Sequence, residues 1–340
     1  MCTCVNNFFE PYPTRASDVS GAFFIHIMMT APILDLRLQY LEEIRWHVGN
    51  TPLHNMVRLL PKKGVEIHAK LEWQQFGGSV KARSTFDIIT KSVVSGALKG
   101  RRLLDASTGS SGVAYAVFGA AANIPVTICI PDNTSNETKH MLQTLGVELI
   151  QTDSTLGYSG AREEAKRLSK ENPDNYCFVD QITHDSNVSA HYKGTGTEIW
   201  FETGGRVTHF IAGIGSSGTL TGVGLKLKEL NPNIQVVGLQ PNDQEHIING
   251  WEFLDSMKTP SIYDSTSFDH IHSVSNEETK RMIVRAAKEE GLLLSPSSAA
   301  NLAGALKLAE SIDEGVIVTI LPDDYKKYSN AKFIGLGEPR

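Results

Sequence analysis

One lysine in a glycine-rich turn is placed where covalent chemistry would be favoured. Lys81 follows the run Gly77-Gly78-Ser79-Val80, and the segment after it predicts a helix with Ser79 as its N-cap. The positive end of a helix dipole and the loss of water both favour the neutral form of such an amine. A neutral lysine amine is a nucleophile that can form a Schiff base. Taken alone, the run also fits an ordinary loop lysine.

Three further loops rich in Gly, Ser and Thr each precede a predicted helix. Segment 107–112 is Ser-Thr-Gly-Ser-Ser-Gly, segment 213–219 is Gly-Ile-Gly-Ser-Ser-Gly-Thr, and segment 295–298 is Ser-Pro-Ser-Ser. Glycines let the backbone approach an anion closely, and the first turn of a helix offers free N–H groups. Segment 213–219 therefore predicts a phosphate cradle, and segment 107–112 could hold a carboxylate by the same donors. The alternatives are a tight strand–helix turn and a simple helix cap, respectively.

Segment 213–219 does not match the common nucleotide-binding loops. It lacks the Gly-Lys-Ser/Thr ending of a triphosphate loop. No acidic residue that could bind a ribose follows the next predicted strand, which ends at Gly238-Leu239-Gln240. A nicotinamide-dependent dehydrogenase would also leave Lys81 without a role.

Short β-branched runs alternate with helical segments along the chain, which indicates an α/β fold. The predicted strands include 126–130, 207–211, 234–239 and 316–321, and the predicted helices are 112–122, 137–145, 160–169, 220–230, 276–290 and 300–312. Continuous apolar strands that alternate with helices predict a parallel sheet buried on both faces. Ligands of such sheets bind at the carboxyl ends of the strands, where the four loops are expected.

Composition limits the remaining classes of protein. The chain has 340 residues, 41% of them hydrophobic, and a formal net charge of −6, which argues against nucleic-acid binding. Its four cysteines form neither a disulfide framework nor a metal-ligand pattern, so we expect a reduced, cytoplasmic protein without a metal. The apolar run 21–34 is too short to span a membrane and lacks the flanks of a secretory signal. Residues 1–35 are interpreted as an arm that packs on a partner subunit, or as the product of an early start codon.

Together and in this order, the loops resemble those of the pyridoxal-phosphate (PLP) enzymes of the cysteine synthase and cystathionine β-synthase family. The resemblance runs from Gly-Asn-Thr-Pro-Leu at 49–53 to Leu-Pro-Asp at 321–323. It implies the fold-type II, tryptophan synthase β-like architecture: two open, twisted, mostly parallel sheets flanked by helices, with PLP in the cleft between domains. The implied large domain comprises 36–85 and 187–340, and the small, mobile domain comprises 86–186. Family members are usually homodimers.

The resemblance also assigns the site. It implies that Lys81 holds PLP as a Schiff base and is the catalytic base. The cofactor-binding residues would be Lys81, Ser110, Gly215, Ser216, Ser217, Gly218, Thr219 and Ser297. The substrate carboxylate would bind Ser107, Thr108, Gly109, Ser111 and Gln181. Ser297 would face the pyridine nitrogen, where a neutral hydroxyl makes the ring a weak electron sink and favours loss of a β-substituent over transamination.

The reaction implied is β-replacement on an O-activated L-serine, through an α-aminoacrylate, to give cysteine or a related β-substituted alanine. Segment 246–264 resembles the isozyme B branch of cysteine synthases, which accepts bulkier nucleophiles. Relatives that use O-phosphoserine carry an arginine where Asn242 and Asp243 follow Gln240-Pro241, so this substrate is disfavoured. The alternatives are β-elimination or dehydration, a catalytically degenerate PLP-binding paralogue, and a PLP-free regulatory protein.

Five positions depart from the family pattern. Ser110 replaces an asparagine, Ala82 an aspartate, Phe76 a proline and Ala299 a glycine, and Tyr325 stands where a small residue usually lines the site. These departures predict a modified pocket. The partners expected are an amino-acid substrate and a nucleophile whose identity the sequence leaves open: sulfide, thiosulfate, a thiocarboxylate, an amine or another thiol.

Overall fold

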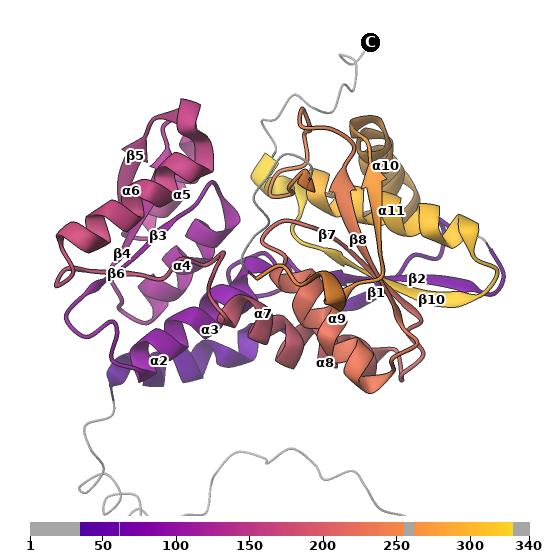
Figure 1. The fold of residues 1–340 in the computed structure, drawn as a ribbon, viewed down its shortest axis with the longest axis horizontal. Helices are drawn as coiled ribbons and strands as arrows, with labels where there is room; N and C mark the ends of the chain where they lie inside the picture. Colours follow the sequence, from indigo (N-terminus) through magenta and orange to yellow (C-terminus); the bar gives the residue numbers. More distant parts are fainter. Residues whose placement is uncertain (1–34, 61, 255–261, 329–340) are drawn as a thin grey trace, which may run out of the picture.

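The computed structural model describes residues 35–60, 62–254 and 262–328, and these form two lobes, each built on its own sheet (Figure 1). Residues 1–34 of the predicted arm lie outside the described residues. The larger sheet has the strand order β1-β2-β10-β7-β8-β9, and the smaller has the order β5-β4-β3-β6. All neighbouring strands are parallel except β1 and β2, which are antiparallel. The predicted α/β class with two mostly parallel sheets is confirmed.

The strands of both sheets are short, and their central members are buried on both faces. The larger sheet comprises β1 (Leu53–Asn55), β2 (Val65–Leu71), β7 (His209–Gly213), β8 (Gln235–Pro241), β9 (His270–Val274) and β10 (Gly315–Leu321). The smaller comprises β3 (Arg102–Ala106), β4 (Val126–Pro131), β5 (Glu148–Thr152) and β6 (Tyr176–Phe178). Every residue of β4 is buried, as expected of a parallel strand covered by helices on each side.

Helices cover both sheets, in the predicted order. They are α2 (Leu36–Ile44), α3 (Lys81–Val94), α4 (Ser110–Ala121), α5 (Asn136–Thr144), α6 (Gly157–Glu171), α7 (Ser186–Ala190), α8 (Gly196–Glu202), α9 (Gly218–Leu230), α10 (Asn276–Glu290) and α11 (Pro296–Ser311). A π-helical turn, His191–Thr195, joins α7 to α8, and short 3-10 turns lie at Arg45–His47, Ser154–Leu156, Ser265–Ser267 and Tyr325–Tyr328. No helix within the described ranges has both the length and the apolar character needed to cross a bilayer.

The beginnings of two helices differ from the prediction. Ser79 is not the N-cap of α3: the cap position is Val80, whose backbone is already helical, and it supplies no side-chain cap. Helix α11 begins at Pro296, four residues earlier than predicted, because the Ser295 side chain caps it by accepting from the Ser298 N–H. Ser297 therefore lies in the first turn of a helix rather than in a loop.

The first described helix packs with the small lobe. Leu41 of α2 is buried in the same apolar cluster as Ile88 and Ile89 of α3 and Leu103 of β3. The family resemblance had placed residues 36–85, and so this helix, in the large domain. The outer limits of the small domain, at 86 and 186, stay predictions.

Candidate active site

A cavity of about 710 Å³ lies where the two lobes meet, at the carboxyl ends of strands from both sheets. The predicted site residues that line it are Lys81, Ser107, Thr108, Gly109, Ser110, Ser111, Gln181, Gly215, Ser216, Ser217, Thr219 and Ser297. Gly218 does not line it. As the first residue of α9, it packs against Asn187, and a Cβ at this position would lie 2.2 Å from Asn187 Oδ1. The structure thus brings together segments separated by more than two hundred residues.

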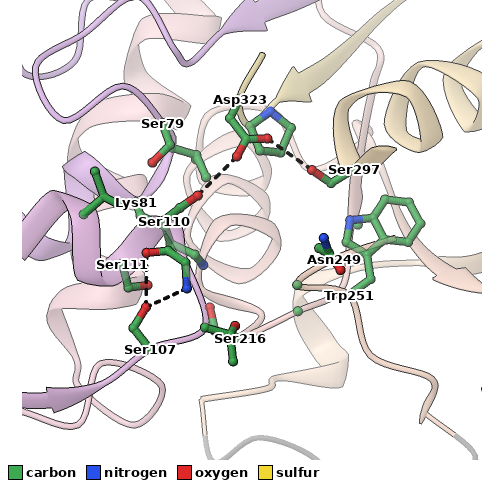
Figure 2. A pocket seen from close by; sticks show the side chains of 18 of the residues that line it. Ser79, Lys81, Ser107, Ser110, Ser111, Ser216, Asn249, Trp251, Ser297 and Asp323 are labelled. Atoms are coloured by element: carbon green, nitrogen blue, oxygen red, sulfur yellow. Dashed lines mark hydrogen bonds between the residues drawn. The ribbon is translucent and has the colours of Figure 1, made fainter. Parts of the chain in front are cut away.

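Lys81 is the first residue of α3 and extends into this cavity (Figure 2). The turn before it is tied to the end of β10, because the Val80 N–H donates to the Pro322 carbonyl at 2.8 Å. Loss of water by burial lowers the pKa of the Lys81 amine, and the charge of Asp323 opposes that shift. The lowered pKa of Lys81 agrees with the sequence prediction, and its main cause is desolvation rather than the helix dipole.

The loop before α9 has the features of an anion cradle. Ser217 adopts a left-handed backbone with a φ of 69°, and its buried hydroxyl has no hydrogen-bond partner in the described part of the chain. The neighbouring Ser216 hydroxyl accepts from Asn187 Nδ2 at 3.0 Å. At Gly215 a Cβ would lie 2.1 Å from the Gly250 carbonyl oxygen, so only glycine fits. An orphaned hydroxyl beside a helix N-terminus is a ready donor for a phosphate.

The loop before α4 is folded by one of its own serines. The Ser107 hydroxyl accepts from the N–H groups of Gly109 at 3.1 Å and Gly112 at 2.9 Å. Gln181 also lines the cavity, and its backbone N–H donates at 3.2 Å to Oδ2 of Asp105, which lies on the strand that leads into this loop. Burial raises the pKa of Asp105 to about 7, although its backbone hydrogen bonds oppose the shift. Ser107 therefore shapes the loop as well as lining the cavity.

The cavity is also lined by residues that the sequence analysis did not assign to the site, among them Asp323, Trp251, Glu252 and Lys326. Asp323, only 3% exposed, lies with its carboxylate between Ser110 and Ser297 (Figure 2). Trp251 and Glu252 also line the cavity, and burial raises the pKa of Glu252. Lys326 lies at the edge of the cavity, although its side chain is largely exposed. Asp323 had been quoted only as the end of a family motif, since its position after a buried strand gives no separate signal.

Most of the positions that depart from the family pattern do not line the cavity. Phe76 packs on the rings of His47 and Phe118, with ring centroids 6.2 and 6.0 Å away. Ala82 and Ala299 are fully buried in α3 and α11. Tyr325 does not line the cavity, which corrects the expectation for it. Of the five positions only Ser110 lies in the cavity wall.

A buried group of charged side chains lies behind Lys81. The Arg83 guanidinium donates to Glu72 at 2.6 Å and to Glu198 at 2.6 Å, and Lys70 pairs with Glu198 at 2.9 Å and with Glu202 at 2.8 Å. Lys70 lies in β2, Glu72 directly follows it, Arg83 lies in α3, and Glu198 and Glu202 lie in α8, so the network joins the Lys81 helix to the large sheet. Within the described residues, no cluster of His, Cys, Asp and Glu could hold a metal ion.

The sequence matches the family model described as "Pyridoxal-phosphate dependent enzyme" over residues 44–323. The chain belongs to the pyridoxal-phosphate dependent enzymes. A cysteine synthase of Aquifex aeolicus is 39% identical over 83% of this chain and 88% of its own length. A cysteine synthase B of Pseudomonas aeruginosa is 35% identical over 86% of this chain and 96% of its own length. An O-acetylserine dependent cystathionine β-synthase of Bacillus subtilis is 34% identical over 83% and 94%.

Solved structures of this PLP-dependent enzyme family agree with the fold. A cysteine synthase of Entamoeba histolytica superposes with a TM-score of 0.81 at 30% identity, covering 88% of this chain and 91% of that one. An O-ureido-L-serine synthase gives the same TM-score at 27% identity, covering 91% and 98%. The family resemblance, including that to isozyme B, and the PLP requirement drawn from the sequence are confirmed.

Proposed function

We propose that this PLP-dependent enzyme replaces the β-substituent of an O-activated L-serine, such as O-acetylserine, by a nucleophile. One observation carries the proposal: Lys81, with an amine pKa lowered by burial, shares a cavity with the orphaned Ser217 hydroxyl at the start of α9 and with a second glycine loop. The names of the relatives, cysteine synthase and O-acetylserine dependent cystathionine β-synthase, support the same reaction.

The residues present fit the cofactor. Gly215 and the first turn of α9, with the hydroxyls of Ser216 and Ser217, would hold its phosphate, and Lys81 would bind its aldehyde. Bound PLP would supply that aldehyde and a conjugated ring that accepts the electrons released when a bond at the substrate Cα breaks. Binding of the phosphate would supply the hydrogen-bond partner that the buried Ser217 hydroxyl otherwise lacks among the described residues.

The chain's own residues would orient the substrate, transfer its proton and exclude water. The loop 107–111 and Gln181 would orient the substrate carboxylate at the N-terminus of α4. The Lys81 amine, whose pKa is lowered by burial, would remove the proton from the substrate Cα and later return it. Movement of the small lobe toward the large one would exclude water while the β-carbon is open to attack.

The nucleophile decides between replacement and elimination. With O-acetylserine and a panel of sulfide, thiosulfate, other thiols and amines, we expect consumption of a nucleophile and formation of a β-substituted alanine. Mass spectrometry of the products and a coupled assay for pyruvate measure the two outcomes. Pyruvate formed at the same rate with and without each nucleophile would instead establish β-elimination, and a purified protein that binds no added PLP would contradict both.

Loss of the orphaned hydroxyl is expected to weaken cofactor binding. Ser217→Ala removes one donor to a phosphate, and a hydrogen bond to a charged group contributes about 1.5–3 kcal/mol, so the PLP dissociation constant should rise roughly 10- to 100-fold. Absorbance titration of the cofactor-free protein measures it. The exposed Ser95, at the end of α3, provides the control Ser95→Ala, which should leave the constant unchanged. Equal constants for wild type and Ser217→Ala would remove this loop from the phosphate site.

Two further properties belong to the proposal. The homodimer is supported by the exposed apolar side chains of Leu36, Tyr40 and Trp46 at the start of the described chain. The cytoplasmic location is supported by the scattered cysteines, two of which, Cys129 and Cys177, are free thiols in the described residues.

A further inference from the structure

Glu252 places a carboxylate in the wall of the cavity, in addition to the groups expected to hold the cofactor and the substrate carboxylate. Within the described ranges, no side chain or backbone group forms an ion pair or hydrogen bond with this carboxylate. Burial raises the pKa of Glu252 above its ordinary value of 4.5. A half-buried carboxylate without a partner is available to accept a proton from a bound molecule.

The backbone of Glu252 is fixed on the loop before α9. Its N–H donates to the Ile214 carbonyl at 2.8 Å. The preceding residue, Trp251, lines the same cavity and packs on Gly213, where a Cβ would lie 2.0 Å from Cε2 of the indole (Figure 2). Glu252 therefore has a defined position beside the expected phosphate site.

Tyr158 connects Glu252 with the side of the cavity expected to hold the substrate carboxylate. This tyrosine lies near the start of α6 in the small lobe and also lines the cavity. Burial raises the pKa of the Tyr158 hydroxyl, and the charges of Asp105 and Glu252 add to that shift. Asp105 lies on the strand that leads into the loop 107–111. A serine bound between this loop and the α9 loop would present its β-carbon to the part of the cavity that Glu252 borders.

The charges around the cavity disfavour an anionic nucleophile. Besides Glu252, the titratable residues that line the cavity are Lys81, Glu137, Tyr158, Asp323 and Lys326. Lys81 would be joined to the cofactor, and Lys326 is largely exposed and pairs with Asp324 at 3.7 Å. No arginine of the described residues lines the wall. An anion such as thiosulfate would therefore lack a bidentate partner and would meet a like charge at Glu252.

A thiol must lose its proton when its sulfur bonds to carbon, and at neutral pH most thiols are protonated. We propose that Glu252 is the base that takes the proton of the incoming nucleophile, and that the site selects neutral thiols over anions such as thiosulfate. This inference rests on the proposed function. The leaving group departs with the electron pair of the Cβ–O bond, and a sulfur lone pair then forms the bond to Cβ. The thiol proton passes to Glu252, which later releases it to water, while Lys81 returns a proton to Cα.

The test separates the two halves of the reaction. The holoprotein is mixed first with O-acetylserine and then with 2-mercaptoethanol or thiosulfate, and the rate of the second step is measured by rapid mixing. At pH 7, Glu252→Gln should lower the rate with 2-mercaptoethanol about 100-fold and should not lower the rate with thiosulfate. The matched control is Glu245→Gln, which changes an exposed carboxylate outside the cavity and should leave both rates unchanged.

The pH profile distinguishes a base from a structural role. The wild-type rate with 2-mercaptoethanol should fall as the pH decreases through the raised pKa of Glu252, because the ionised carboxylate is the active form. In Glu252→Gln the rate should follow the fraction of thiolate, about tenfold per pH unit around neutrality. Glu252→Ala provides a second variant, since added formate should restore its rate with 2-mercaptoethanol.

A measurement independent of turnover is carbon-13 NMR of the cofactor-free protein labelled at the glutamate carboxyls. The Glu252 signal, identified by its absence from Glu252→Gln, should be that of an ionised carboxylate at pH 7, and a protonated carboxyl would refute its role as a base. Equal rates with 2-mercaptoethanol in the wild type and Glu252→Gln, or a wild type that prefers thiosulfate, would overturn the inference. Release of acetate from O-acetylserine before a nucleophile is added tests the proposed function separately. Acetate release without an effect of Glu252→Gln would refute this inference alone, whereas no acetate release from the wild type would refute the proposed function.

Discussion

Replacing Lys81 by alanine is expected to lower turnover of O-acetylserine by about 10³-fold or more, because the variant loses both the covalent attachment of the cofactor and the base at Cα. Among the described lysines only Lys81 and Lys326 line the cavity, and the Lys326 side chain is largely exposed. Burial lowers the pKa of the Lys81 amine, and the charge of Asp323 opposes that shift. Turnover is measured with saturating PLP, so that weaker cofactor binding does not account for the loss. Borohydride reduction and peptide mapping should find a pyridoxyl group on residue 81 in the wild type alone.

The exposed Lys99, just beyond the end of α3, provides the control. Lys99→Ala should keep the activity and the pyridoxyl adduct on Lys81, because its side chain lies outside the cavity. Wild-type activity in Lys81→Ala, or a pyridoxyl adduct on a different lysine, would refute the assignment of the site.

The second large effect concerns the buried charges behind Lys81. Arg83→Met should reduce the free energy of unfolding by about 3–5 kcal/mol, because it leaves the fully buried Glu72 carboxylate without its partner in a low-dielectric region. Glu198 would lose its bond to the same guanidinium. Urea denaturation followed by circular dichroism measures the loss. Since Arg83 is two residues from Lys81, we expect activity to fall as well, through displacement of the α3 N-terminus.

A surface arginine gives the matched control. Arg167, about half exposed, pairs with Glu164 and Glu171 on α6, and Arg167→Met should change stability by less than about 1 kcal/mol. The double variant Glu72→Gln/Arg83→Met should recover part of the loss, because it removes the uncompensated charge. A single Arg83→Met variant as stable as the wild type would show that the pairs contribute nothing to folding.

The same network predicts the acid sensitivity of the protein. Burial alone would raise the pKa of Glu198, but the hydrogen bond and charge of Arg83 and the charge of Lys70 lower it to about 2, from an ordinary value of 4.5. A carboxyl whose pKa is lower in the folded state contributes stability that is present above its unfolded pKa and is lost as pH falls toward the folded value. Stability should therefore decrease between these two pH values, and the decrease should be smaller in Arg83→Met.

Many helices and strands could be predicted because residues near their ends, such as capping residues and glycines, favour a particular local structure. Helix α10 occupies the predicted range, Asn276–Glu290, since a capping box at Ser275 and Glu278 marks its start and Gly291 its end. The starts of α3 and α11 were misplaced where backbone geometry and tertiary contacts, rather than the nearest serine, decided the cap. At Ser79 the hydroxyl is buried without a partner among the described residues, a state no propensity predicts.

The parts of the candidate site that are short continuous segments of the chain could be predicted from the sequence. Lys81, the α9 loop and the α4 loop each carry a pattern within a few residues, because glycine and hydroxyl side chains at a helix start have a local mechanism. Parallel-sheet topology then requires that such loops meet at one edge. Glu252 and Trp251 lie in a segment without a comparable pattern, so they were found only through the cavity.

The sequence by itself determined the α/β order of elements and the PLP family, and it predicted the lysine that would meet the cofactor, because these depend on spacing along the chain. Only the tertiary structure decided which groups surround that lysine: the carboxylate of Asp323 between Ser110 and Ser297, and the Arg83 network joining α3 to the large sheet. Ser110 and Asp323 are 213 residues apart in sequence. The contact between Ser110 and Asp323 is set by how the two lobes pack, which no local pattern in the sequence records.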